Sequence, residues 1–211
     1  PFPYLKTPSI PSFYLVALGF MLALSVLAVR VAGGPFRQMV PFADLFCMGV
    51  AFLLLETKHV VQFALLFGTT WFVNAFVFGG ILVSVLLAVL LSKRVVIRRT
   101  GWLYVLLLAG VALNWVVPAD ALLELAMGPR LVVAVSLAFF PIFVANLVFA
   151  SRFRDTERST AAFGANLLGA MVGGLLEYVS LLTGYRSLLI LVAVLYGLAF
   201  LLRPRVAVAA A

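Results

Sequence analysis

The chain has 211 residues, of which 65% are hydrophobic and 10% are charged, and its mean hydropathy is +1.23. A soluble domain carries about a quarter charged residues, so this chain has too few polar side chains to cover a water-facing surface. The composition excludes a disordered protein and a soluble nucleic-acid-binding protein. The single cysteine, Cys47, excludes a disulfide scaffold. We therefore expect an integral membrane protein whose solvent is the lipid bilayer.

Glycines, prolines and charged residues divide the chain into seven apolar runs, and a membrane-spanning helix needs about 20 such residues. The runs cover residues 12–31, 41–67, 70–91, 102–117, 131–150, 161–182 and 187–202. Polar residues interrupt the second run, so we expect this segment to be irregular or re-entrant. The pattern predicts an all-α polytopic transmembrane bundle of about seven segments, with residues 1–211 as a single transmembrane domain. Because the chain begins at Pro1 without the features of a signal peptide, we expect a fragment or processed part of a longer chain.

Fifteen Lys and Arg residues outnumber seven Asp and Glu residues, and their clusters are typical of topology signals on short cytoplasmic loops. Seven spans with the amino end outside place four basic residues outside and these eleven inside: Arg30, Arg37, Lys93, Arg94, Arg98, Arg99, Arg152, Arg154, Arg158, Arg203 and Arg205. A re-entrant second segment would change the division to ten inside and five outside. Both arrangements predict a cytoplasmic carboxyl terminus.

Polar residues within the apolar runs are the first candidates for function, because burying ionisable groups in a bilayer is costly. In the second run, Glu56 and His59 would share one face of a continuous helix, with Gln62 next along it. Such a face could relay protons or bind a cation. In the alternative that we favour, Glu56 pairs with Lys58 or another basic group, and the cluster marks an interfacial bend between two helical pieces.

The sixth run contains Asn166 and Glu177, which are eleven residues, or about three turns, apart and therefore point the same way. Small side chains also recur every four residues, at Ala161, Ala165, Gly169 and Gly173. This spacing lets two helix backbones approach closely, and we expect the partner to be another helix of the bundle rather than another chain. Glu177 would then be a polar contact, or a proton-binding site if a cavity reaches it.

In the third run we expect Asn74 to form a hydrogen bond with a neighbouring helix. One histidine and one cysteine cannot supply a zinc site or an axially ligated haem, and the sequence contains no Walker A, dinucleotide-binding or HExxH motif. We therefore expect no cofactor, no metal and no catalytic residue, and no enzymatic activity of this chain alone.

Four stretches together resemble a known family: residues 1–5 leading to Ile10 and Pro11, 52–58 (FLLLETK), 66–74 (LFGTTWFVN) and 164–178 (GANLLGAMVGGLLEY). They are similar to the carboxyl-terminal membrane half of bacterial spermidine-synthase-like integral membrane proteins. In that family a Rossmann-like aminopropyltransferase or methyltransferase-type domain is joined to multi-helix membrane regions. The resemblance implies no catalytic residue here, because the family's cofactor pocket and polyamine-binding acids belong to the soluble domain.

Two functional hypotheses follow. In the first, the chain is a non-catalytic membrane module of the bacterial inner membrane, acting as the anchor for an upstream soluble domain or as an accessory subunit beside other membrane proteins. In the second, it is a transporter for cations such as polyamines, with Glu56 and Glu177 as substrate or proton sites. We favour the first, because seven spans without an inverted repeat are few for a secondary transporter.

Overall fold

The computed structural model describes residues 12–95, 100–154 and 156–204, so the expectations for residues 1–5, Ile10 and Pro11 lie outside it. The described residues form a helical bundle, which confirms the all-α prediction. Its principal helices are α1 (Ser12–Gly33), α2 (Ala43–Phe67), α3 (Trp71–Arg94), α4 (Thr100–Val116), α6 (Met127–Arg154), α7 (Ser159–Leu176) and α9 (Leu188–Leu202). Two short helices, α5 (Ala119–Leu123) and α8 (Ser180–Thr183), lie in the connections.

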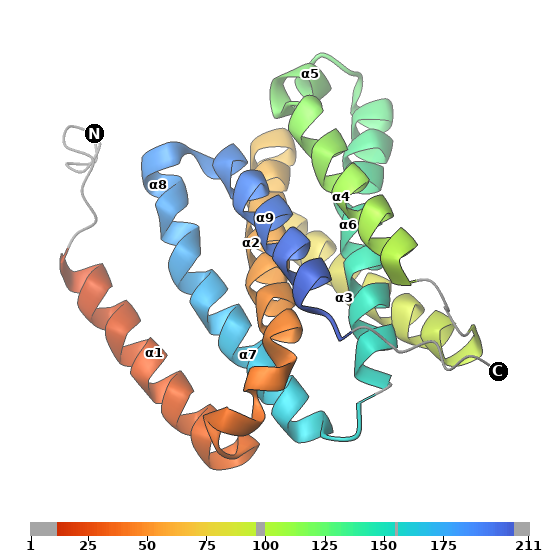
Figure 1. Cartoon of the computed structure of the whole chain (residues 1–211). Coiled ribbons are helices and arrows are strands. Elements are labelled where there is room, and N and C mark those ends of the chain that lie inside the picture. Colours follow the sequence, from red (N-terminus) through yellow and green to blue (C-terminus); the bar gives the residue numbers. More distant parts are fainter. Residues whose placement is uncertain (1–11, 96–99, 155, 205–211) are drawn as a thin grey trace.

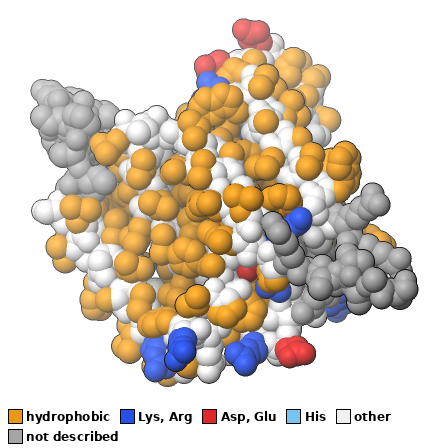
Figure 2. Space-filling view, viewed as in Figure 1, with side chains coloured by type: hydrophobic (Ala, Val, Ile, Leu, Met, Phe, Trp, Pro, Cys, Tyr) orange, Lys and Arg blue, Asp and Glu red, His pale blue; other side chains and the backbone are white. Residues whose placement is uncertain are grey.

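The described segments include six helices that are long and apolar enough to cross a membrane, and α4 is a shorter apolar helix. Many large hydrophobic side chains are exposed, and they cover the face of the molecule seen in Figure 2. Water would oppose such a surface, whereas the hydrocarbon of a bilayer accepts it. The structure is therefore that of a multi-pass membrane protein.

Helix α2 is the centre of the bundle and packs against α7, α9, α6 and α3 (Figure 1). Its residues Leu45, Ala51, Leu54 and Leu55 are fully buried. Helix α4 packs against α6 and α9 at the opposite side of the bundle from α1. The polar residues of α2 therefore lie where several helices meet.

The prediction that the second segment is irregular or re-entrant is wrong. Helix α2 runs without interruption through residues 56–59, and two 3₁₀ turns, Phe36–Gln38 and Val40–Phe42, precede it. Its 25 residues extend for about 37 Å, more than the ~30 Å of a bilayer's hydrocarbon core. The helix continues without a bend because some of its polar side chains form hydrogen bonds with residues of neighbouring segments. These partners take the place of the water molecules that the side chains would contact at a bend.

One end of the bundle gathers the basic residues. Three contacts join helix termini there: Arg152 Nε with Asp44 Oδ2 at 2.8 Å, Arg154 Nη1 with the Ser92 carbonyl oxygen at 2.6 Å, and Arg203 Nη1 with Thr100 Oγ1 at 3.4 Å. These contacts place the starts of α2 and α4 beside the ends of α6, α3 and α9. Lys and Arg side chains accordingly lie along the lower edge of the molecule in Figure 2. We call this the basic end of the bundle.

Helix α1 stands at the edge of the bundle and packs chiefly against α7 (Figure 1). Val29 is the one buried residue of this helix. The connection to α2 turns sharply at Gly34, whose φ of +88° lies in the region that favours glycine, and Pro35 follows it. Most of α1 is thus exposed in the chain described here.

Candidate functional site

Lys58 is a charged residue embedded deep in the bundle, with 1% of its surface exposed. Its Nζ donates hydrogen bonds to Gln62 Oε1 at 2.5 Å, one turn along α2, and to Asn114 Oδ1 at 2.8 Å, on α4. Both acceptors are neutral amide oxygens, and no described carboxylate forms an ion pair with Lys58. The predicted pairing of Glu56 with Lys58 is therefore wrong.

Both the oxygen and the nitrogen of the Asn114 side-chain amide form hydrogen bonds. While Oδ1 accepts from Lys58, Nδ2 donates to the carbonyl oxygen of Leu137 on α6 at 2.7 Å and to that of Gly110 at 3.0 Å. Leu137 is four residues before Pro141, which has no N–H to close the helical hydrogen bond. Asn114 thus supplies the donor that the proline removes, and it connects α4, α6 and α2.

No described hydrogen bond links the side chains of Glu56 and His59. His59 is fully buried, and neither ring nitrogen has a hydrogen-bond partner among the described residues. Glu56 is half-buried on α2, and its carboxylate forms no ion pair with any described residue. The predicted polar face along Glu56, His59 and Gln62 is therefore not a hydrogen-bonded relay, because Gln62 accepts from Lys58 instead.

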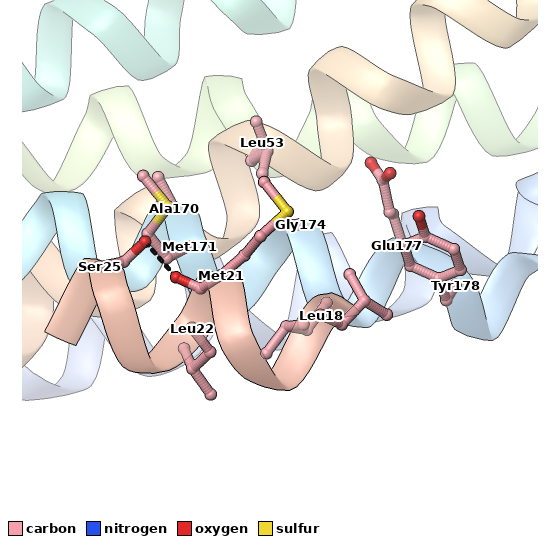
Figure 3. Close-up of a pocket in the computed structure, with 11 residues that line it drawn as sticks. Leu18, Met21, Leu22, Ser25, Leu53, Ala170, Met171, Gly174, Glu177 and Tyr178 are labelled. Carbon is pink, nitrogen blue, oxygen red and sulfur yellow. Dashed lines mark hydrogen bonds between the residues drawn. The ribbon is translucent and has the colours of Figure 1, made fainter. Parts of the chain in front are cut away.

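Glu177 lies directly after α7, in the 3₁₀ turn Glu177–Val179, and its Oε2 accepts a hydrogen bond from Thr57 Oγ1 of α2 at 2.7 Å. It also lines a cavity of about 310 Å³ between α1 and α7. Figure 3 shows Leu18, Met21, Leu22 and Ser25 of α1 along this cavity, with Glu177 and Tyr178 at one end. The carboxylate is the acidic group in a mainly apolar lining. The cavity therefore suits an apolar ligand that carries at most one polar or cationic group.

The small residues of α7 face α2, which is the internal partner that the spacing predicts. A Cβ atom at Gly169 would meet the carbonyl oxygen of Phe46, and one at Gly49 of α2 would meet the carbonyl oxygen of Asn166. A Cβ atom at Gly173 would lie 2.9 Å from the Val50 carbonyl oxygen, and Ala165 is buried on the same face. Asn166 Nδ2 also donates to the Leu45 carbonyl oxygen at 3.0 Å. The two backbones approach closely because glycine stands on both helices.

The structure does not bring Asn74 to a neighbouring helix. Its side chain is exposed near the start of α3, where Thr70 Oγ1 caps the helix by accepting from the Val73 N–H at 3.3 Å. The expectation of an interhelical hydrogen bond from Asn74 is not met by any described contact. An amide one turn from a helix start can instead face the polar headgroup region.

Asn114 and Gly49 are functional positions that the sequence pattern does not predict. Asn114 is a single amide in the apolar run 102–117, so it carried the same signal as Asn74 and Asn166. Gly49 is an isolated glycine without small residues at four-residue spacing, and its role depends on the facing helix. Neither the partner of Asn114 nor that of Gly49 can be read from local sequence.

The described residues contain no group of three or more His, Cys, Asp or Glu side chains that could hold a metal ion. Chemically, the arrangement joins helices to one another: hydrogen bonds connect α2 to α4, to α7 and to the turn Glu177–Val179, and an ion pair connects α2 to α6. Comparison with known proteins found no matching family model, no similar curated protein and no similar solved structure.

Proposed function

We propose that this chain is a non-catalytic membrane module, the anchor or an accessory subunit of a larger membrane assembly. The observation that carries this proposal is the use of the intramembrane polar side chains as cross-helix ties. Lys58, Asn166 and Glu177 each form a hydrogen bond to another helix or to its backbone. Groups held in this way stabilise one arrangement of helices, which is what an anchor requires.

The proposal includes a location and partners. The basic end would face the cytoplasm of a bacterial cell, with the carboxyl terminus on that side, because Lys and Arg are retained on the cytoplasmic face. The partners would be other membrane subunits or an upstream soluble domain, as in the spermidine-synthase-like proteins that the sequence resembles. The extensive apolar exposure of α1 supports contact with lipid or with a neighbouring membrane protein.

Native mass spectrometry tests this proposal on the chain extracted from its own membranes in a mild detergent. A module should appear in a stoichiometric complex with a second subunit, or as part of a chain that carries a soluble domain. A single bare copy of the chain, with no stable partner across several detergents, would contradict the anchor and the accessory roles together.

A second candidate, a transporter for cations such as polyamines, is favoured by one observation: the Glu177 carboxylate lines the cavity beside α1. Uptake of labelled spermidine into proteoliposomes tests it. A transporter should show saturable uptake that is lost in Glu177→Gln and in Glu56→Gln, whereas a module should show none. Asp120→Asn, which changes a carboxylate of the short helix α5, is the matched control.

A further inference from the structure

A second cavity between α1 and α7, of about 270 Å³, continues the one that Glu177 lines. Ser25 and Met171 border both cavities, and Figure 3 shows them at the end of the first cavity opposite to Glu177. From there the second cavity follows the two helices to Gly33, the last residue of α1, and to Thr160, near the start of α7. The two cavities thus form one groove along α1 and α7, which reaches the basic end of the bundle and which we call the α1–α7 groove.

The half of the groove toward the basic end has a mainly apolar lining. Small side chains of α1 leave the space and larger side chains of α7 form the other wall, with Ser25, Ala28 and Ala32 on α1 and Phe163, Leu167 and Met171 on α7. Four of these six residues are exposed, so the groove opens on the outer surface of the bundle. The Ser25 hydroxyl donates to the Met21 carbonyl oxygen of its own helix at 2.7 Å. The groove is therefore suited to an apolar ligand that enters sideways from the bilayer.

The groove narrows toward the basic end, because the two helices meet there. A Cβ atom at Gly33 would lie 3.7 Å from the Cα atom of Gly164, and the Met39 side chain packs against both glycines. A transmembrane helix with its side chains is about 10–12 Å across, so it can lie over this seam but cannot enter it. An acyl chain carries no side groups and is slim enough to fill a seam between two helices.

Three arginines stand where the groove meets the basic end. Arg30 is in the last turn of α1, Arg37 is in the first 3₁₀ turn after it, and Arg158 directly precedes α7. All three are exposed, and none forms an ion pair with a described carboxylate. The neighbouring Glu157 offsets one of the three charges. Since Glu177 gives the other end of the groove a negative charge, the two ends together favour an anionic group at the basic end.

We propose that the α1–α7 groove binds an anionic phospholipid from the leaflet at the basic end, with its phosphate among the three arginines and one acyl chain along the groove. Guanidinium groups donate paired hydrogen bonds to phosphate oxygens, and basic pockets between transmembrane helices favour anionic headgroups. The groove from Ser25 to Gly33 follows α1 for about 12 Å, close to the ~15 Å depth of one leaflet. The proposal goes beyond the module function, because it assigns a lipid ligand and depends on no partner subunit.

Native mass spectrometry of the purified full chain in detergent tests this assignment, with dioleoyl phosphatidylglycerol as the probe. The lipid should bind saturably, as a single copy per chain. Dioleoyl phosphatidylcholine has the same acyl chains but no net charge, and its Kd should be at least about tenfold higher. Glycerol 3-phosphate has the charge but no acyl chain, so an equal concentration should not displace the lipid. Equal affinities for the two lipids, displacement by glycerol 3-phosphate, adducts that increase without saturation, or a dimer that excludes the lipid would each overturn the proposal.

Arginine variants locate the headgroup. Arg30→Gln and Arg158→Gln should each raise the Kd for phosphatidylglycerol about fivefold, with little change for phosphatidylcholine, because each removes one charge beside the phosphate. Arg94→Gln is the matched control and should bind like the parent. It removes an exposed arginine from the basic end on α3, a helix that packs against α6 and α2. Equal losses in all three variants would reflect surface charge in general and refute the headgroup site.

Alanine variants locate the acyl chain. Ala28→Leu and Ala32→Leu fill the groove and leave the arginines in place, so each should raise the Kd for phosphatidylglycerol at least about tenfold. Both positions are exposed, so the Tm should stay close to that of the parent. Ala23→Leu adds the same side chain to the opposite face of α1, where it is exposed, and is the control. Parental affinity in both Ala28→Leu and Ala32→Leu would place the lipid elsewhere and refute the groove.

Discussion

Asn114 of α4 donates a hydrogen bond to the carbonyl oxygen of Leu137 on α6, the acceptor that Pro141 leaves without its helical N–H. The same amide accepts from Lys58. The carbonyl group freed by the proline, the asparagine amide and the lysine ammonium group thus form one chain of hydrogen bonds. This chain joins α6, α4 and α2 in the interior of the bundle. Removing its central member would leave a donor and an acceptor unpaired at the same time.

We therefore expect Asn114→Leu to destabilise the bundle by about 1–3 kcal/mol, since buried polar groups lose their partners. Replacing Pro141 with Ala in that background should recover part of the loss, because the Leu137 carbonyl regains a helical donor. Reversible unfolding in mixed micelles measures the double-mutant cycle. Asn74→Leu is the control and should change little, as that amide is exposed. Additive effects of the Asn114 and Pro141 changes would argue against the link.

The contact between α2 and α7 makes a second prediction. Gly169→Ala and Gly49→Ala should each lower the free energy of unfolding by about 1–3 kcal/mol, because the new methyl group meets a backbone carbonyl that cannot move aside. Gly79→Ala on α3 is the matched control, since nothing lies within 4 Å of its Cβ position, and it should be neutral or slightly stabilising. Equal responses of Gly169 and Gly79 in thermal unfolding would show that the two helices do not approach this closely.

The ion pair between Asp44 and Arg152 supports a third prediction. Asp44 is buried, so Arg152→Met should leave an unpaired carboxylate and cost about 3–5 kcal/mol. Changing Asp44 to Asn as well should restore much of the stability, because no charge is then left without a partner. Chemical unfolding of the single and double variants gives the comparison. If the double variant is no more stable than Arg152→Met, the unpaired Asp44 carboxylate is not the cause of the stability loss in Arg152→Met.

Cysteine labelling tests the orientation of the bundle. In a Cys47→Ala background, Glu124→Cys should react with an impermeant maleimide added to intact cells, whereas Glu157→Cys should react only after lysis. The two positions are exposed and lie at opposite ends of α6, which runs from Met127 to Arg154. The reverse pattern would place the basic end outside and contradict the proposed topology.

Hydropathy was sufficient to predict the apolar helices, because the bilayer imposes length and apolarity on each helix separately. Six of the seven predicted segments correspond to described helices long enough to span a membrane, whereas the run 102–117 forms the shorter helix α4. The continuity of α2 was not predictable in this way. A Glu-Thr-Lys-His run favours a bend when the helix is considered alone, but Asn114 and Glu177 bond to Lys58 and Thr57 from segments more than fifty residues away. The four-residue spacing around Gly169 predicted a packing face, whereas the facing glycine at position 49 stands alone in its own helix. Pairings of this kind depend on the fold and cannot be predicted from the local sequence pattern.

The peripheral position of α1 has a consequence for how the chain is assembled. Its principal contact, α7, begins at Ser159, more than a hundred residues after α1 ends at Gly33. At translation rates of about 5–20 residues per second, α1 leaves the ribosome roughly 6–25 s before its packing partner exists. During that interval its small residues near Gly33 face lipid or the insertion machinery. Helix α1 is thus synthesised before the rest of the described bundle but is among the last of its helices to be packed, because its partner lies in the carboxyl-terminal third of these residues.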